Sequence, residues 1–288
     1  MIDTLSLPAS EAWTNQISKI LNNGYVVIPS IYNHEHETSM PCVTKEVVGT
    51  QMVVDMNYPV IVVPERNLSY KFMAAESLWI LDGSNDLEAI ARYNKVMRRF
   101  SDDGKTLFGA YGPKFISQLP YILETLSEDT GSRRAVFNIW RESPPPTKDT
   151  PCTLNAQFLI RGNKLNMIVN MRSSDVWLGV PYDIFAFSMM SFKVLSELND
   201  AHGEAWLGIG DLYINFGSSH IYLGEEDGQQ NNGLGAIKCI SSDKRYELGP
   251  KVPYGYLVTK NGYELFIKQI RRMCNLNFSG EYMFAITE

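Results

Sequence analysis

The chain has 288 residues, of which 44% are hydrophobic and 20% are charged. These values are ordinary for a globular protein with a large core, and the length does not require two domains. The net charge of −6 excludes a global basic field that would recruit nucleic acid, although a single phosphate needs only a local group of arginines.

The first predicted elements are helices and strands in alternation. Residues 10–22 carry apolar side chains on one face at helical spacing, which indicates an amphipathic helix with Ser10 as its cap. Residues 43–54 and 60–63 are rich in β-branched side chains and predict strands. Residues 70–81 have helical composition but are apolar nearly all round, so this helix should be buried.

The rest of the chain predicts further helices and hairpin-connected strands. A turn at Gly162-Asn163 joins two of these strands directly. The expected elements are a helix at 116–126, strands at 135–140, 153–160 and 165–171, a helix at 182–198, and strands at 206–216 and 238–240. No internal repeat, low-complexity tract or linker is evident, so we expect one α+β domain that spans residues 1–288.

Cysteine spacing and the N-terminal sequence indicate the cellular compartment in which the protein is expected. The cysteines are far apart, without CxxC or metal-ligand spacing: Cys42, Cys152, Cys239 and Cys274. The N-terminal sequence lacks a basic region followed by an apolar core, and no apolar stretch approaches the roughly 20 residues of a membrane helix. We therefore expect a cytoplasmic protein with free thiols, no bound metal and no membrane partner.

Cys152 is the first candidate for chemistry. It follows a proline-rich loop at the start of a predicted strand, where a side chain can face a cleft. A buried structural cysteine is the alternative, whereas a nucleophile needs nearby cations that lower its pKa. Arg133-Arg134 could supply cations or bind phosphate, because arginine is a fork-shaped donor, but adjacent arginines also form solvated surface pairs.

Three other residues stand out by their position. Glu76 lies within the apolar helix, where a buried carboxylate must be paired, hydrogen-bonded or protonated, unless it faces water at the helix edge. A raised pKa would make it a general acid or base. His220 and Tyr222 alternate as on a strand, so both point the same way, in a binding or a structural role.

The segment 152–190 carries the most specific pattern. Cys152-Thr153 opens a strand, residues 170–176 (NMRSSDV) end the returning strand, and residues 178–181 (LGVP) open a long helix. This order resembles the thymidylate synthase superfamily, whose Asp-Val-Phe-Leu-Gly-Leu-Pro-Phe step is similar to DVWLGVPY here almost residue for residue. The resemblance runs from about residue 45 to about residue 225, and residues 226–288 match poorly.

The resemblance implies a fold, a co-substrate and three catalytic residues. The fold is a mixed sheet packed with long helices, with one sheet face forming a homodimer interface. The co-substrate is 5,10-methylenetetrahydrofolate. Cys152 matches the nucleophile that adds to pyrimidine C6, Glu76 matches the glutamate that manages protons on the ring through water, and Tyr111 matches a tyrosine near the reacting carbon.

The resemblance also implies binding residues. Arg172 and Ser173 match phosphate ligands, while Arg133 and Arg134 match a pair that reaches the phosphate in the partner subunit's site. Asp175 matches the aspartate that contacts the folate pterin. The pair that holds the sugar 3′-hydroxyl is matched by His220 and Tyr222. An N-terminal phosphate-loop arginine has no match, since Ser39 falls near that place, and Arg66 or Lys45 could substitute for it.

Several residues depart from the thymidylate synthase pattern, and these departures indicate which branch of the superfamily the chain resembles. Thr153 replaces the usual histidine after the nucleophile, Met171 replaces a glutamine, and Asp183 replaces the asparagine that reads uracil. Met97 and Phe100 fall where synthases place indoles that pack on the folate. These departures resemble the deoxycytidylate hydroxymethylase branch known from T-even phages.

Asp183 also has a physical argument of its own. Uracil offers an N3–H donor and an O4 acceptor, which an amide side chain meets together, whereas cytosine offers an N3 acceptor and an N4 donor. A carboxyl group can accept from N4 and share a proton with N3. A mispaired buried polar group costs roughly 1–3 kcal/mol, so Asp183 favours cytosine. Its other role is an acidic residue at a helix N-terminus.

The resulting expectation is a dCMP 5-hydroxymethyltransferase, in the host cytoplasm if phage-encoded. Water rather than hydride would complete the reaction, because Met97 and Phe100 should pack the folate loosely. Ser173 favours a deoxynucleotide over a ribonucleotide. The alternatives are a methylating enzyme acting on dCMP or dUMP, a CMP hydroxymethylase of nucleoside biosynthesis, and a catalytically inactive nucleotide- or RNA-binding relative.

Overall fold

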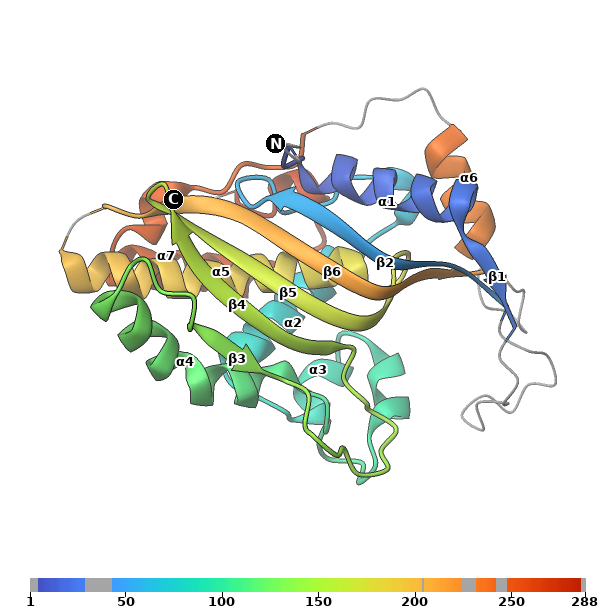
Figure 1. Cartoon of the computed structure of the whole chain (residues 1–288), viewed down its shortest axis with the longest axis horizontal. Helices are drawn as coiled ribbons and strands as arrows, with labels where there is room; N and C mark the ends of the chain where they lie inside the picture. Colours follow the sequence, from blue (N-terminus) through green and yellow to red (C-terminus); the bar gives the residue numbers. More distant parts are fainter. Residues whose placement is uncertain (1–4, 29–42, 204, 224–231, 242–247, 286–288) are drawn as a thin grey trace.

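A mixed β-sheet forms the centre of the fold (Figure 1). The computed structural model describes residues 5–28, 43–203, 205–223, 232–241 and 248–285. Within them the strand order is β1-β2-β6-β5-β4-β3, with β5 and β6 parallel and the other neighbours antiparallel. The strands are β1 (Tyr25–Val27), β2 (Thr44–Asp55), β3 (Val136–Asn138), β4 (Thr153–Arg161), β5 (Lys164–Asp175) and β6 (Gly208–Tyr222).

Helices pack against this sheet, with α5 and α2 behind the strands in the view of Figure 1. The α-helices are α1 (Ala9–Asn23), α2 (Tyr70–Leu81), α3 (Leu87–Ala91), α4 (Tyr111–Glu128), α5 (Val180–His202), α6 (Asn232–Ser241) and α7 (Lys260–Met273). Short 3-10 helices are η1 (Pro64–Arg66), η2 (Lys95–Phe100), η3 (Tyr254–Leu257) and η4 (Gly280–Tyr282). The structure thus confirms the predicted α+β class.

The core lies between α5 and the strands. Phe185, Phe187 and Phe192 of α5 are completely or almost completely buried. Burying aromatic side chains of this size contributes strongly to folding, because it removes a large apolar area from water. The hairpin between β4 and β5 turns at Gly162 and Asn163, both with φ near +57° (57° and 56°), as a tight two-residue turn requires.

Three local predictions are wrong. Residues 60–63 are buried but form no strand, because Val62 N donates to Ser10 Oγ at 3.0 Å and the Ile61 carbonyl accepts from Tyr70 Oη at 2.9 Å. Ser10 is therefore not the cap of α1; Pro8 occupies that position. Residues 238–240 belong to helix α6 rather than to a strand.

The outward face of the sheet carries a row of amide side chains. Gln51 Nε2 donates to Asn215 Oδ1 at 2.7 Å, Asn215 Nδ2 donates to Asn170 Oδ1 at 2.9 Å, and Asn170 Nδ2 donates to Asn155 Oδ1 at 2.8 Å. These four residues, here called the amide ladder, cross β2, β6, β5 and β4 in register. Each donor and acceptor of the ladder links neighbouring strands on a face that the core does not cover.

Candidate active site

Cys152 lies in the residue before β4 and is held by the neighbouring strand β5. The backbone N–H of Arg172 donates to the Cys152 carbonyl at 2.9 Å. The Arg172 guanidinium donates to the carbonyls of Pro151 at 3.0 Å and Thr150 at 3.1 Å. The pKa of the Cys152 thiol is raised overall, chiefly by burial, and the positive charge of Arg172 offsets part of that increase. Arg172 therefore both positions the cysteine loop and favours the thiolate.

Glu76 and Asp183 form a pair of carboxyl groups beside this cysteine. Burial, followed by the charge of Asp183, raises the pKa of Glu76 to about 8. Burial raises the pKa of Asp183 to about 7. No described residue donates a hydrogen bond to either carboxyl. The pKa of each acid therefore lies close to physiological pH, where a carboxyl can both give and take a proton. The charge of Asp183 also raises the pKa of Cys152 and Tyr111, so Asp183 lies within electrostatic reach of the other three groups, here called the Cys152 cluster.

Tyr111 enters the cluster from the first residue of α4. Its hydroxyl oxygen accepts a hydrogen bond from Thr153 Oγ1 at 2.9 Å, and its ring stacks on Phe187 with centroids 6.3 Å apart. Burial raises the pKa of Tyr111 well above its usual value, so the phenol stays protonated and can donate to a substrate. Thr153, the residue after Cys152, thus orients the tyrosine.

His220 and Tyr222 lie on β6 with their rings in contact, as their alternation predicts. The ring centroids are 5.3 Å apart in an edge-on arrangement. Burial lowers the pKa of His220, which favours the neutral imidazole. Ser218 Oγ lies 3.4 Å from His220 Nδ1 and donates to the Glu46 carboxylate. His220 pairs in register with Asp175 of β5, so the two predicted ligand sites are adjacent.

Asp175 has one occupied and one open carboxylate oxygen. Oδ1 accepts from the backbone N–H of Trp177 at 2.8 Å and of Leu178 at 2.9 Å. Oδ2 is buried and has no hydrogen-bond partner among the described residues, and burial raises the pKa of Asp175 to about 6. A buried acceptor of this kind needs a donor, and the N–H groups of a pterin ring supply one. Asp175 therefore has an acceptor oxygen left for a ligand donor.

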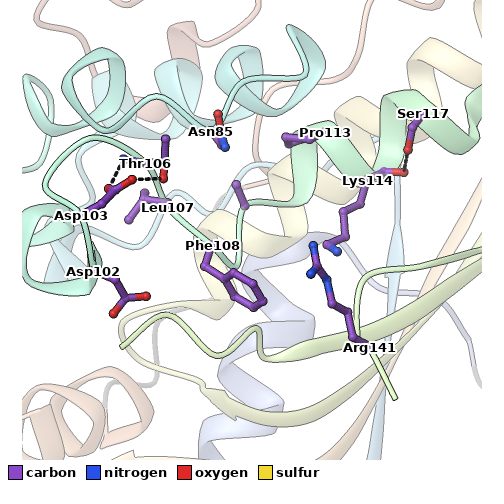
Figure 2. Close-up of a pocket in the computed structure, with 11 residues that line it drawn as sticks. Asn85, Asp102, Asp103, Thr106, Leu107, Phe108, Pro113, Lys114, Ser117 and Arg141 are labelled. Carbon is purple, nitrogen blue, oxygen red and sulfur yellow. Dashed lines mark hydrogen bonds between the residues drawn. The ribbon is translucent and has the colours of Figure 1, made fainter. Parts of the chain in front are cut away.

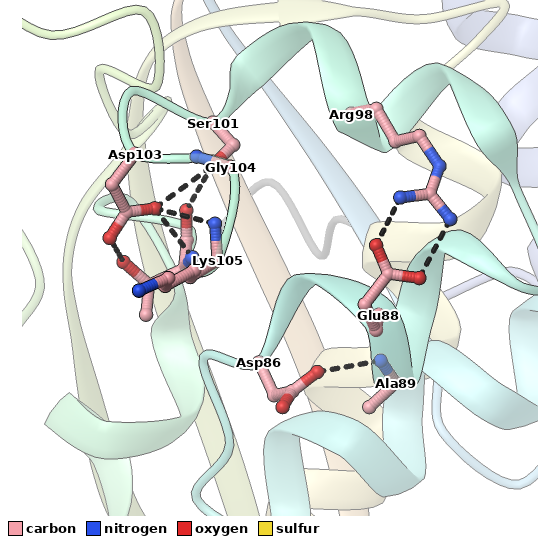
Figure 3. Close-up of polar contacts among 9 residues, drawn as sticks. Asp86, Glu88, Ala89, Arg98, Ser101, Asp103, Gly104 and Lys105 are labelled. Atoms are coloured by element: carbon pink, nitrogen blue, oxygen red, sulfur yellow. Dashed lines mark hydrogen bonds and ion pairs between the residues drawn. The ribbon is translucent and has the colours of Figure 1, made fainter.

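Met97 and Phe100 both belong to η2. Met97 is partly buried against the core, whereas Phe100 is 37% exposed. The ion pair between Arg98 of η2 and Glu88 of α3 fixes this short helix (Figure 3). The structure gives neither residue a contact with the Cys152 cluster, so their role at the co-substrate stays a prediction.

Arg133 and Arg134 are not brought to Cys152 in the same chain. Both are exposed and precede β3, and the Ala135 carbonyl next to them accepts from Phe158 N at 2.9 Å. Phe158 is six residues along β4 from Cys152, which is about 20 Å at the rise of a β-strand. The arginine pair therefore lies at a different part of the sheet from Cys152 of the same chain.

The two residues considered as substitutes for the phosphate-loop arginine have other contacts. Arg66 Nε donates to the Trp177 carbonyl at 2.6 Å, next to Asp175, and burial lowers the pKa of Arg66. Lys45 Nζ donates to the Leu21 carbonyl at 2.5 Å. Ser39 lies outside the described residues. Arg66 thus belongs to the Asp175 side of the site.

Sequence reasoning missed two members of the site. Asp149 Oδ2 accepts from the Gly109 N–H at 2.6 Å, and burial raises the pKa of Asp149. Gly109 permits this approach, since a Cβ there would lie 2.6 Å from the Asp149 carbonyl oxygen. Trp140 places its ring 5.7 Å from the Arg172 guanidinium. The short distance from Asp149 to Cys152 in the sequence was the available signal.

The described ranges contain neither a candidate metal site nor a membrane-spanning helix. The described side chains contain no group of three or more histidine, cysteine, aspartate or glutamate residues that could hold a metal ion. Among the helices of the described part, none combines the length and apolarity needed to cross a membrane.

Comparison with known proteins gives the family. Residues 11–274 match the family model described as thymidylate synthase. A deoxyuridylate hydroxymethyltransferase of Pseudomonas phage M6 is 41% identical over 142 residues, which are 46% of this chain and 39% of that protein. A deoxyuridylate hydroxymethyltransferase of Bacillus phage SP01 is 32% identical over 179 residues, which are 55% of this chain and 45% of that protein. The matched region thus spans less than half the length of these relatives. Because the family match covers most of its length, the chain belongs to the thymidylate synthase family.

Proposed function

We propose that this protein transfers a one-carbon unit from 5,10-methylenetetrahydrofolate to C5 of dCMP and adds water, giving 5-hydroxymethyl-dCMP. The observation that carries the proposal is the position of Asp183. It lies close enough to Cys152, Glu76 and Tyr111 to shift the pKa of all three groups. This position supports a role for the Asp183 carboxyl in reading the ring edge of a bound pyrimidine.

The chain's own residues can perform each proton step. Attack of the Cys152 thiolate on C6 makes C5 nucleophilic, and Arg172 favours that thiolate. The folate co-substrate supplies the carbon at the oxidation level of formaldehyde. Glu76, with its pKa near 8, can give and take protons at the ring through water at neutral pH. Asp175 would hold the pterin through its open oxygen.

The protonation of Asp183 bears directly on the base. With a pKa near 7, the carboxyl can share a proton with cytosine N3 and accept from the N4 amino group. Cytosine N3 is a much better proton acceptor than uracil O4. The same carboxyl therefore pairs more strongly with dCMP than with dUMP, and Ser173 favours the deoxyribose over the ribose of CMP.

A second candidate substrate is dUMP. Two relatives carry the name deoxyuridylate hydroxymethyltransferase. A fully protonated Asp183 offers one donor and one acceptor, which also matches the O4 and N3–H edge of uracil. Hydroxymethylation is common to both candidates, and the base is what separates them.

The relatives also support the hydroxymethyl product over a methyl product. Their names specify hydroxymethyl transfer. Phe100 is exposed and Met97 is only partly buried, so η2 presents no indole that would exclude water from the co-substrate. Water would then reach the exocyclic carbon before hydride is transferred.

We further propose a homodimer in which each site needs both subunits. Arg133 and Arg134 lie about 20 Å along β4 from their own Cys152, so they suit the phosphate of a second site. The outward sheet face that carries the amide ladder would form the interface. Mixing inactive Cys152→Ala protein with inactive Arg133→Ala/Arg134→Ala protein should restore activity, because one of the two sites in the mixed dimer is intact. No recovery after subunit exchange would contradict the shared site.

Two measurements test the proposed reaction: the release of tritium from C5 of the nucleotide, and the identity of the folate product. Wild-type protein should release tritium from C5 of labelled dCMP and form tetrahydrofolate, without the absorbance increase of dihydrofolate. Cys152→Ala should lose tritium release by at least about 10³-fold, as removal of a nucleophile does. Accumulation of dihydrofolate would identify a methylating enzyme instead. Tritium release that persists in Cys152→Ala would reject the covalent route.

A further inference from the structure

A cavity of about 530 Å³ lies beside the first turns of α4 and is separate from the Cys152 cluster (Figure 2). It is lined by the loop at 102–108, by α4 and by Arg141, and none of Cys152, Glu76 or Asp183 lines it. Its volume lies within the range of roughly 300–1,000 Å³ that holds small organic ligands.

Two cations face each other in this cavity. Lys114 of α4 and Arg141 extend toward one another in Figure 2. Burial and the charge of Arg141 lower the pKa of Lys114. Across the described residues, neither cation has an ion pair or donates a side-chain hydrogen bond. Two like charges in a partly enclosed space repel each other, so an anion placed between them would be bound favourably.

The carboxylates that line the same cavity do not supply that anion. Asp102 accepts from Thr147 Oγ1 at 2.5 Å and from the Lys148 backbone N–H at 3.0 Å. Asp103 accepts from the backbone N–H groups of Lys105 and Thr106, each at 2.7 Å (Figure 3). Asp103 therefore stabilises its own loop and Asp102 ties that loop to residues 147–148, so neither described carboxylate is an ionic partner of the two cations.

An aromatic side chain lies next to the cations. The Arg141 guanidinium lies 4.8 Å from the centre of the Phe108 ring, and the ring is only partly buried. An apolar ring surface beside two cations suits a ligand that joins a planar ring to an anionic group. Arginine also prefers the fork-shaped geometry of a phosphate.

We propose that this cavity is a second ligand site for a nucleoside phosphate, with the phosphate between Lys114 and Arg141 and the base against Phe108. The cavity adjoins the catalytic cluster, because α4 begins at Tyr111 and the same loop donates from Gly109 N to Asp149 Oδ2. A bound nucleotide would therefore contact the segment that positions the catalytic tyrosine. This site stands independently of whether the substrate is dCMP or dUMP.

The test is calorimetric titration of the full chain with dATP, in the presence of saturating dCMP or dUMP to occupy the substrate site. We expect one dATP per chain, with affinity reduced at least about tenfold in Lys114→Gln and in Arg141→Gln. Lys105→Gln removes the same charge from the neighbouring loop outside the cavity and should leave affinity within about twofold. Unchanged affinity in both cavity variants would overturn the site.

Further measurements test whether the site needs the nucleoside part of the ligand and whether the variants remain folded and active. Inorganic pyrophosphate should bind more weakly than dATP, and equal affinity would overturn the nucleoside part of the proposal. Tritium release and Tm should stay at the wild-type level in Lys114→Gln, since no hydrogen bond or ion pair within the described residues joins the Lys114 side chain to a catalytic group. If that variant is unstable, Phe108→Leu keeps an apolar side chain and should still weaken dATP while sparing pyrophosphate.

Discussion

Two pairs of acidic residues in this molecule have opposite environments. Glu76 and Asp183 in the candidate active site receive no hydrogen bond from a described residue, and burial raises their pKa to about 8 and about 7. Asp102 and Asp103 in the neighbouring loop accept several hydrogen bonds, which lower the pKa of both. The same chemical group therefore has a pKa near neutral pH in one region and is ionised at neutral pH in the other.

This difference in hydrogen bonding explains why the two pairs of carboxyl groups have pKa values shifted in opposite directions. A carboxylate whose oxygens are filled by backbone N–H groups is stabilised as an anion and fixes a loop. A carboxyl without donors is unstable as an anion, and its open oxygens remain for a substrate. Variants of the two pairs should consequently differ in what they change: activity and base choice in one region, stability in the other.

The largest effect is expected from Glu76→Gln. The amide keeps the shape of the side chain but cannot transfer a proton, so kcat should fall by about 10²–10⁴-fold. Steady-state tritium release from the nucleotide measures this change. Glu124→Gln, on the exposed face of α4, is the matched control and should retain wild-type kcat. A Glu76→Gln enzyme with near-normal kcat would remove Glu76 from the mechanism.

Asp183→Asn should change which base the enzyme prefers rather than abolish its activity. An amide pairs with uracil through both groups but lacks the proton that the carboxyl shares with cytosine N3. The ratio of kcat/KM for dUMP to that for dCMP should rise by about tenfold to a hundredfold, which corresponds to roughly 1–3 kcal/mol for a mispaired group. An unchanged ratio would show that Asp183 does not read the base.

The smallest effect concerns stability, and the two regions should respond to pH with opposite signs. Glu76 and Asp183 have a folded pKa above the unfolded value, so their contribution to stability is greatest below about pH 4 and is lost as pH rises towards 8. Asp103 has a lowered pKa, so its contribution is present at neutral pH and is lost as pH falls below about 4.

Thermal unfolding of two variants measures this contrast. Asp183→Asn should raise Tm at pH 8 and change it little at pH 4, because the amide removes the cost of a buried anion. Asp103→Asn should lower Tm at pH 8, by about 2–4 °C or less, and have little effect at low pH. The same sign for both variants at pH 8 would contradict the assigned environments.

The sequence predicted the long elements well because each carries its own pattern. The apolar stretch at 70–81 and the Gly162-Asn163 turn have local causes, and both occur as predicted. Residues 60–63 look like a strand by composition but gain their hydrogen bonds from Ser10 and Tyr70 instead. Only tertiary structure could reveal those partners.

The candidate site likewise contains residues that a sequence motif identifies and contacts that only the tertiary structure reveals. Cys152, Glu76 and Asp183 were found through motif order, and the structure brings them together. The hydrogen bond from Thr153 to Tyr111 joins residues 42 positions apart, and Asp149 reaches Gly109 across 40 positions. Such pairs leave no local signal, because packing of α4 against the sheet creates them.

The central claim is that this chain makes a hydroxymethylated pyrimidine nucleotide. Its most direct test is mass analysis of the products formed from dCMP and from dUMP, each offered separately with 5,10-methylenetetrahydrofolate. The account predicts a product of dCMP that is heavier by one formaldehyde unit, formed faster than any product of dUMP. A product heavier by only one methylene unit, from either nucleotide, would contradict it.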